Sequence, residues 1–310
     1  MPHHINRIYT LTIAVTLATQ ALWAFDYKLK PKRVSPSVWC FFGKLEAPSP
    51  SNGGHMSNSC YIKTDKSYVV VDSGPTYQFA QQSYEAMLNI AKLPVKTVIN
   101  SHYHDDHWQG NSYYKEAFNA TLIGTGLQQK SYKAGDETRI QRMTSPAIFK
   151  GTTIVKLDTI IKQKTTLSIG HKKIILTPVG TKAHTDEDIF TYFADEKVVF
   201  TGDLVMNGRI SSNRDGSVLG ELEAHKMIHA TGWRVLIPGH GLVIDTHALD
   251  ESSLYFKLLK ERVGKAVDDD IGADEVTKAV SLPEFKEKAL YKELNKRNIF
   301  DAYNELEFSE

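Results

Sequence analysis

A cluster of histidines and aspartates directly after an apolar, strand-like run is the strongest indication of the fold of this chain. The apolar run 95–100 predicts a strand, and the residues that follow it, 101–107, read Ser-His-Tyr-His-Asp-Asp-His. Functional side chains in α/β folds gather at the carboxyl ends of strands, which is where this cluster lies. The cluster therefore predicts an α/β fold with a polar site at one edge of a sheet.

The spacing of the cluster, H-x-H-x-D-H, suits metal coordination. His102 and His104 project to one side because strand side chains alternate with period two, and the turn then brings Asp106 and His107 toward the same pocket. Imidazole and carboxylate groups suit zinc, iron or manganese. Four ligands exceed the three protein ligands of a simple open catalytic site, so the segment predicts two metals side by side.

Three further ligand candidates follow other apolar runs of the chain. They are His184, Asp203 and His240. Each lies in or beside a glycine-containing turn, and glycine permits the tight turns that bring loops to a shared site. The alternative is a set of satisfied polar core residues, which the common placement of the seven residues at strand ends disfavours.

Alternating strand and helix patterns indicate an α/β layered fold. The predicted strands cover 38–42, 59–63, 67–72, 95–100, 120–123, 174–178, 189–193, 198–201 and 235–238. The predicted helices cover 76–91, 108–117 and 216–229, with a less certain one at 136–143. From residue 250 onward the pattern predicts two to four helices, broken near Gly272 and Pro283.

Residues 1–24 resemble a signal peptide. Arg7 precedes the apolar run 8–18, which is too short to span a bilayer, and Ala21–Ala24 resembles a small-residue cleavage site. A buried N-terminal helix is the alternative. No later segment approaches the roughly 18 apolar residues of a membrane span, so we expect a soluble mature protein that is periplasmic or secreted.

The two cysteines, Cys40 and Cys60, lie in two predicted strands. Export to an oxidising compartment favours a disulfide between them. Two buried thiols are the alternative, and the sequence leaves both open.

The order of these motifs resembles that of the metallo-β-lactamase-fold hydrolase superfamily over roughly Val38–His247. The resemblance rests on the 102–107 cluster, His184, the Thr-Gly-Asp at 201–203 and the Gly-His at 239–240. It implies a four-layer αββα sandwich with metals at one edge between the sheets, followed by a C-terminal helical extension. The implied division is a signal peptide at 1–24, a metallo-β-lactamase-like domain at 25–248 and the extension at 249–310.

The resemblance also implies roles for the candidate residues. One metal would be held by His102, His104 and His184, the other by Asp106, His107 and His240, with Asp203 bridging them. Asp72, in the strand-ending Val-Val-Asp-Ser-Gly, would orient ligands. The metals would be two Zn²⁺ ions per chain, with iron or manganese as alternatives.

The implied activity is hydrolysis of an ester, thioester, lactone or β-lactam by a metal-bound hydroxide that the catalytic Asp106 orients. The resistance enzymes of the family generally have Cys or Ser at the bridging position, so Asp203 argues against a dedicated β-lactamase. A small-molecule substrate is expected. A finer resemblance to an exported subgroup linked with sulfur oxidation and quinoprotein systems rests on Asn52–Gly54, Ser57–Asn58, Arg297–Asn298 and 302–307.

Three rival functions stay open at this stage. A mononuclear iron dioxygenase acting on a thiol or persulfide shares the fold and the link to sulfur. A nuclease is disfavoured by export and by the formal net charge of +1, so no nucleic-acid partner is expected. A non-catalytic binding module is disfavoured by the complete ligand set, and the oligomeric state is open. His225, His229 and His247 are expected to be solvated.

Overall fold

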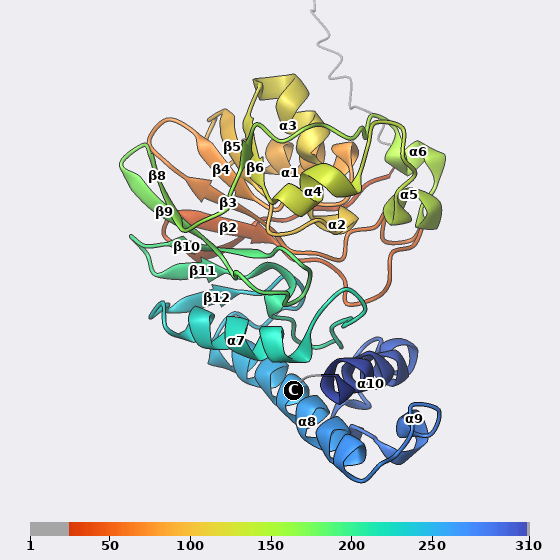
Figure 1. Cartoon of the computed structure of the whole chain (residues 1–310). Helices are drawn as coiled ribbons and strands as arrows, with labels where there is room; N and C mark the ends of the chain where they lie inside the picture. The colour runs from red at the N-terminus through yellow and green to blue at the C-terminus, as the bar shows by residue number, and fades with distance from the viewer. Residues whose placement is uncertain (1–24, 309–310) are drawn as a thin grey trace, which may run out of the picture.

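Two β-sheets packed face to face form the centre of the computed structural model, which describes residues 25–308 (Figure 1). The predicted signal peptide lies outside these residues. The first sheet has seven strands in chain order: β1 (Lys32–Ser35), β2 (Val38–Phe41), β3 (Ser59–Lys63), β4 (Tyr68–Val71), β5 (Val95–Ile99), β6 (Thr121–Gly124) and β7 (Thr159–Ile160). Strands β1 to β4 pair antiparallel, and β4 to β7 pair parallel.

The second sheet has five strands in the order β12-β11-β10-β9-β8. They are β8 (Thr165–Ile169), β9 (Lys172–Pro178), β10 (Ile189–Phe193), β11 (Val198–Phe200) and β12 (Val235–Ile237). All of its pairs are antiparallel except β11 with β12.

Helices cover the outer faces of both sheets and form the C-terminal region. They are α1 (Tyr77–Met87), α2 (Asp105–Trp108), α3 (Asn111–Phe118), α4 (Gly126–Ser131), α5 (Arg139–Met143), α6 (Pro146–Phe149), α7 (Val218–His229), α8 (Thr246–Asp268), α9 (Val276–Ala279) and α10 (Tyr291–Glu307). Two short 3-10 helices complete the set: η1 (Gly202–Leu204) and η2 (Pro283–Phe285). Among residues 25–308, no helix is long and apolar enough to cross a membrane.

The alternation of side chains along the strands produces the layers. In β4, Val69 and Val71 point into the core between the two sheets, whereas Tyr68 and Val70 pack under α1 and α3. On the other sheet, Val199 of β11 and Leu236 of β12 pack against α7 and the start of α8. The fold is therefore the predicted αββα sandwich, with helices on both outer faces.

The C-terminal extension has its own apolar core, in which α8, α9 and α10 pack together. Helix α8 crosses from one core to the other: Ala248 and Leu249 pack against the sandwich, and Phe256 and Leu259 pack into the extension (Figure 1). The predicted helical extension is thus present. Residue 249, where we predicted the boundary, lies inside this continuous helix.

The predicted helix 108–117 corresponds to α3, which begins only at Asn111; Trp108 instead ends a separate short helix, α2, and Gly110 lies between the two. A Cβ atom at Gly110 would lie 2.2 Å from the carbonyl oxygen of Ser73, so only glycine allows this close packing. The break matters because α2 carries Asp106 and His107, which the sequence pattern had left in a turn.

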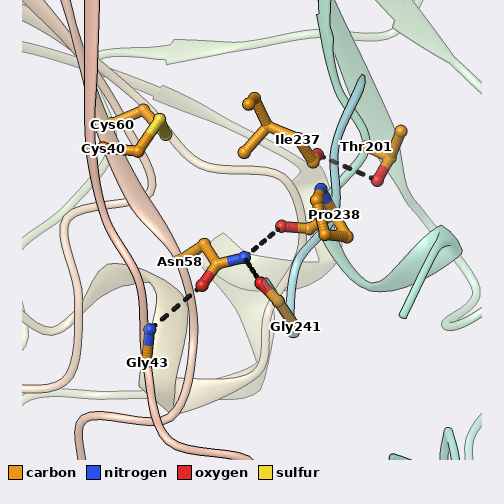
Figure 2. Close-up of a disulfide and its surroundings, with 8 residues drawn as sticks. All are labelled: Cys40, Gly43, Asn58, Cys60, Thr201, Ile237, Pro238 and Gly241. Carbon is orange, nitrogen blue, oxygen red and sulfur yellow. Dashed lines mark hydrogen bonds between the residues drawn. A yellow bond between two sulfur atoms is a disulfide. The ribbon is translucent and has the colours of Figure 1, made fainter. Parts of the chain in front are cut away.

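The predicted disulfide between Cys40 and Cys60 is present and joins the adjacent strands β2 and β3 (Figure 2). Both residues are buried in the core between the sheets. The bridge closes a loop with a sequence separation of 20 residues, and this loop runs beside the site described below.

Candidate metal centre and its cavity

The seven predicted metal-ligating residues meet at one edge of the sandwich. His102 and His104 follow β5, and the short helix α2 next to them carries Asp106 and His107. The second sheet supplies the other three: His184 from the loop between β9 and β10, Asp203 from η1 after β11, and His240 after β12. The strand ends of two sheets are therefore needed to assemble the site.

One group consists of His102, His104, His184 and Asp203. The Nδ1 atom of His104 lies 3.1 Å from Nε2 of His102 and 3.0 Å from Nε2 of His184. The Oδ2 atom of Asp203 lies 3.3 Å from Nε2 of His184. Three imidazole nitrogens and one carboxylate oxygen thus converge on one point.

The second group consists of Asp106, His107 and His240. The Oδ2 atom of Asp106 lies 3.3 Å from Nε2 of His240 and 3.5 Å from Nε2 of His107. The other oxygen of Asp203, Oδ1, lies 3.1 Å from Nε2 of His107 and 3.2 Å from Nε2 of His240. Asp203 therefore directs one oxygen to each group, which is the arrangement a bridging ligand requires.

The residues present fit a pair of metal ions. Among the described residues, Oδ2 of Asp106, Nε2 of His107 and Oδ1 of Asp203 are buried and have no hydrogen-bond partner. Buried polar atoms without a partner are costly, so their convergence indicates that another group completes the site. An all-nitrogen-and-oxygen donor set is typical of zinc, iron or manganese.

The carboxylates of this site are held in the ionised form. Burial opposes ionisation of Asp106, but His107 and Arg139 outweigh it and hold the pKa of that carboxyl well below its usual range. Burial likewise opposes ionisation of Asp203, and His107 and His240 hold its pKa low. Both carboxylates are therefore available as charged ligands.

Asp72 supports the site from behind, as predicted. Its Oδ2 lies 2.8 Å from Nδ1 of His107 and accepts a hydrogen bond of 2.8 Å from Oγ of Ser101. Ser101 Oγ lies 3.0 Å from Nδ1 of His102, so a single carboxylate orients one imidazole in each group. Asp72 has a φ of 55°, a left-handed conformation that aspartate tolerates better than most residues.

Two other ligand candidates, His104 and His184, have acidic neighbours that the sequence did not reveal. Nε2 of His104 lies 3.1 Å from Oδ2 of Asp215, and Nδ1 of His184 lies 3.7 Å from the buried carboxyl of Glu221. Burial raises the pKa of Glu221 well above its usual range. The nearby Asp188 instead accepts hydrogen bonds from the Thr185 N–H at 2.7 Å and from the Thr185 hydroxyl at 2.9 Å.

The loop 56–58 ties the two sheets together at the site. Nδ1 of His240 lies 2.6 Å from the carbonyl oxygen of Met56, and the Ser57 hydroxyl donates to the carbonyl of Asp106 at 2.6 Å. The Asn58 side chain donates to the carbonyls of Pro238 and Gly241, both at 2.9 Å (Figure 2). These contacts fix the loop that carries His240.

Arg139 is a site residue that sequence reasoning missed. From α5 it donates to Oδ1 of Asp105 at 2.9 Å and 3.1 Å and to Oδ1 of Asp106. The bond to Asp106 leaves only Oδ2 of that carboxylate facing the second group. No local pattern marks Arg139, since its partners lie more than 30 residues away.

A cavity of about 270 Å³ is lined by five of the seven residues, namely His104, Asp106, His184, Asp203 and His240. Met56, Met206, Leu290 and Leu294 contribute apolar surface, and Arg139, Arg209 and Arg214 contribute positive charge. Leu290 and Leu294 belong to the C-terminal extension. A larger groove of about 870 Å³ between α7 and α8 contains none of the seven residues, so we place the site in the smaller cavity.

Of the three histidines predicted to be solvated, His225 is buried, so the prediction is wrong for this residue. It is buried under α8, where Nε2 lies 2.7 Å from the carbonyl of Leu204 and Ser253 lies 3.0 Å from Nδ1. The extension covers it, which the helical pattern of 216–229 did not indicate. His229 and His247 are exposed, as predicted.

Comparison with known proteins places this architecture in a family. The family model described as the metallo-beta-lactamase superfamily matches residues 52–246, and the chain belongs to that superfamily. Solved structures agree on the fold: a metallo-beta-lactamase from Pontibacter korlensis aligns with a TM-score of 0.58 and 17% identity over 74% of this chain and 99% of that one. A metallo-beta-lactamase from Hirschia baltica aligns with a TM-score of 0.56 and 14% identity, over 74% and 97%.

Two kinds of relative indicate the class of reaction. A Methanocaldococcus jannaschii protein named as a metallo-hydrolase is 25% identical over 214 residues, which cover 66% of this chain and 97% of the relative. The hydroxyacylglutathione hydrolase of Brucella ovis is 28% identical over 159 residues, 50% of this chain and 52% of that enzyme. The match thus spans about half of the Brucella protein. Together with the metal-binding groups of the site, these findings identify a metal-dependent hydrolase.

Proposed function

We propose that this protein is an exported dinuclear zinc hydrolase that cleaves a carbonyl-type bond in a small molecule: an ester, thioester, lactone or β-lactam. The observation that carries the proposal is the carboxylate of Asp203, whose two oxygens face two separate groups of ligand atoms. Two zinc ions bound there would lower the pKa of a water molecule and polarise the substrate carbonyl.

The chain's own residues support this reaction. Asp106 lines the cavity, and Arg139 binds its Oδ1, so Oδ2 is left to accept a hydrogen bond from the attacking water and to orient it. The water adds to the carbonyl carbon, the bond from that carbon to its O, S or N leaving group breaks, and the leaving group departs with the proton of the water. Asp72 holds His107 in place during the reaction.

The disulfide supports export, since disulfides persist in oxidising compartments such as the periplasm or the extracellular space. The signal-peptide pattern of residues 1–24 points the same way. The volume of the cavity, about 270 Å³, favours a small-molecule substrate over a nucleic acid.

The test is metal analysis of the mature protein, paired with hydrolysis assays on nitrocefin, a thioester and a lactone. Two zinc ions per chain with turnover of any of these substrates would support the proposal. One iron ion per chain, oxygen uptake on a persulfide and no hydrolysis would overturn it in favour of the mononuclear dioxygenase.

The variant Asp106→Asn tests the role of the orienting carboxylate. We expect hydrolysis to fall by about 100-fold or more, because an amide cannot accept a proton and orients water differently. The matched control is Asp186→Asn, an exposed aspartate two residues from His184 that forms an ion pair with Lys182. Full activity of Asp106→Asn with both metals retained would exclude the orienting role.

A further inference from the structure

We propose that Tyr27 is a positioning residue for the metal centre. It lies in residues 25–29, a segment that we call the strap, and it fixes the loop 52–58, which in turn holds His240 and the backbone of Asp106. The inference rests on the proposed function for the identity of the metal and for any effect on hydrolysis. The orientation of His240 can be measured without turnover.

The strap is clamped to α1 by one side chain. Nε2 of Gln82 donates to the carbonyl of Phe25 at 2.7 Å, and Oε1 of the same amide accepts from the Tyr27 N–H at 3.0 Å. Tyr27 and Leu29 also pack against the core under α1 and α3. The strap therefore has a defined position, although it precedes the first strand of the sheet.

The hydroxyl of Tyr27 connects α1 to the loop 52–58. It lies 2.9 Å from the carbonyl oxygen of Gly53 and 2.8 Å from Oγ1 of Thr76. A carbonyl can only accept, so Tyr27 donates to Gly53, and the Thr76 hydroxyl donates to Tyr27. Thr76 also accepts from the Phe79 N–H at the first turn of α1. Burial raises the pKa of Tyr27 well above its usual range, so the hydroxyl keeps the proton that it donates.

The loop is shaped to receive the strap. Gly53 has a φ of 60°, and a Cβ atom there would lie 2.7 Å from the ring of Tyr27 and 2.8 Å from the ring of Phe25. The ring of His55 lies on the same side, with its centroid 4.5 Å from that of Phe79 and 6.2 Å from that of Tyr27. The glycine at position 53 therefore lets the strap lie directly on the loop.

The same loop contacts two metal-ligating candidates. Met56 follows Gly53 by three residues, and its carbonyl accepts a hydrogen bond of 2.6 Å from Nδ1 of His240. The Ser57 hydroxyl donates to the carbonyl of Asp106 at 2.6 Å. A partner of this kind fixes the tautomer and the orientation of a metal-ligating imidazole. A shift of the loop at Gly53 would therefore move the acceptor that orients His240.

Tyr27 acts through the loop and not on the substrate. Of the described residues 25–29, none lines the cavity of about 270 Å³. The first group of ligands, which includes His102 and His184, is supported instead by Ser101 and by the acid beside His184. Loss of the Tyr27 hydroxyl should therefore affect the second group, which contains His240, and leave the first group unchanged.

Tyr27→Phe, which removes only the hydroxyl, tests this selectivity. The readout is the Nδ1–H signal of His240 in long-range proton–nitrogen NMR spectra of the zinc-loaded protein. We expect the signal to shift and its exchange with water to rise by about 3- to 10-fold, the range for loss of one net hydrogen bond. The ring signals of His102 and His184 should stay in place. An unchanged His240 signal would overturn the inference.

Gln82→Leu tests the strap from its other side. Among residues 25–308 the hydrogen bonds of the Gln82 side chain go only to the strap, so this variant loosens the strap without removing a contact of the loop. We expect the same shift at His240. The matched control is Gln81→Leu, since Gln81 bonds Glu85 at the exposed surface of α1. A lower melting temperature in both strap variants with an unchanged His240 signal would reduce the strap to a stabilising role and overturn the proposal.

Competition with a chelator gives a second readout. In Tyr27→Phe we expect one of the two zinc affinities to fall by about 3- to 10-fold, less than the cost of removing a direct partner of a ligand, and the other to stay unchanged. Equal losses in both affinities would contradict the selective link to His240. If no substrate is hydrolysed, the proposed function fails, whereas the His240 signal still decides on Tyr27.

Discussion

The seven metal-ligating candidates form the floor of the cavity, and the other residues that line it, among them Arg139 and Arg209, form its walls. Floor and walls differ in how many hydrogen-bond partners their charged side chains have. On the floor, the metal-ligating candidates are backed by fixed partners, as when Asp72 binds His107 and Met56 binds His240. On the walls, Arg139 is paired with two aspartates, whereas no carboxylate of the described residues pairs with Arg209, and its Nε has no hydrogen-bond partner among them. The floor residues are therefore fixed by several partners, whereas one charged side chain of the walls is not.

The two parts also differ in origin. The floor comes from residues that follow strands of the sandwich, and the family model covers all of them. The walls come from the loop that carries Ala47, Pro48 and Met56, from α5, from the loop 206–215 and from residues 290–294, and the last of these lie outside the range that the family model matches. Variation of the walls can therefore change the substrate without disturbing the metal centre, which is how loops on a rigid scaffold usually acquire new specificity.

The largest effect is expected at the residue that joins the two halves of the floor. Asp203→Asn replaces the carboxylate that faces both groups, so we expect less metal per chain and a loss of hydrolysis of about 1000-fold or more, as removal of several kcal/mol of metal-derived stabilisation implies. Metal analysis and steady-state kinetics check this. Retention of two metals and near-normal activity would contradict the bridging role.

Asp72→Asn should have the next largest effect, because it weakens the support behind the floor. The carboxylate accepts from the Ser101 N–H through Oδ1 and contacts the Ser101 hydroxyl and His107 through Oδ2, whereas an amide has one acceptor oxygen for these two positions. We expect metal affinity to fall by about 10- to 100-fold, the usual cost of losing such a partner. Competition with a chelator measures it, and an unchanged affinity would show that the orientation of His107 does not depend on Asp72.

Changing each of the two wall arginines to methionine should affect the free energy of unfolding differently. Arg139→Met leaves the buried Asp105 without its cation and should lower the free energy of unfolding by about 2 kcal/mol, since Arg139 itself is partly exposed. Arg209→Met removes a buried cation that has no acceptor and should leave stability unchanged or raise it by up to about 1 kcal/mol.

Chemical denaturation of the metal-free protein compares the two variants directly. Equal destabilisation by both substitutions would break the contrast between a paired and an unpaired arginine. A loss at Arg209 alone would mean that its guanidinium has a structural partner.

The smallest effect is expected where the extension is attached to the sandwich. Glu305 of α10 accepts hydrogen bonds from the Ser217 hydroxyl at 2.6 Å and from the Val218 N–H at 2.7 Å, at the first turn of α7. Glu305→Gln removes the negative charge from this helix N-terminus and should cost about 1 kcal/mol. Thermal denaturation checks this against Glu307→Gln, a control at the exposed end of the same helix. Equal losses would show that the contact with α7 adds nothing.

Much of the floor could be predicted from the sequence because its residues come in local patterns. His102, His104, Asp106 and His107 lie within one short segment after a buried strand, and the other three follow apolar runs and glycines. The split of one predicted helix into α2 and α3 was not predicted, because it depends on Gly110 meeting the backbone of Ser73, far away in sequence.

The walls could not be predicted in this way. Arg139, Arg209 and Glu221 each lie in stretches with no motif, and their roles arise from partners or neighbours brought close only by the folded chain. Asn298 and Glu305 were noted in the sequence as part of a subgroup pattern, yet the pattern did not say what they do. The structure shows that they attach the extension to the loop and helix beside the cavity.

Local patterns in the sequence were enough to predict the layered fold and to select the seven residues that meet at the floor, and two cysteines leave a single possible disulfide. These features follow from short-range periodicity and from side-chain chemistry, which a linear pattern records. The folded chain was needed to show which oxygen of Asp203 faces which group, that residues 290–294 line the cavity, and that Nε of Arg209 has no partner among the described residues. Those facts depend on contacts between residues distant in the chain, because burial and pairing are properties of the packed molecule.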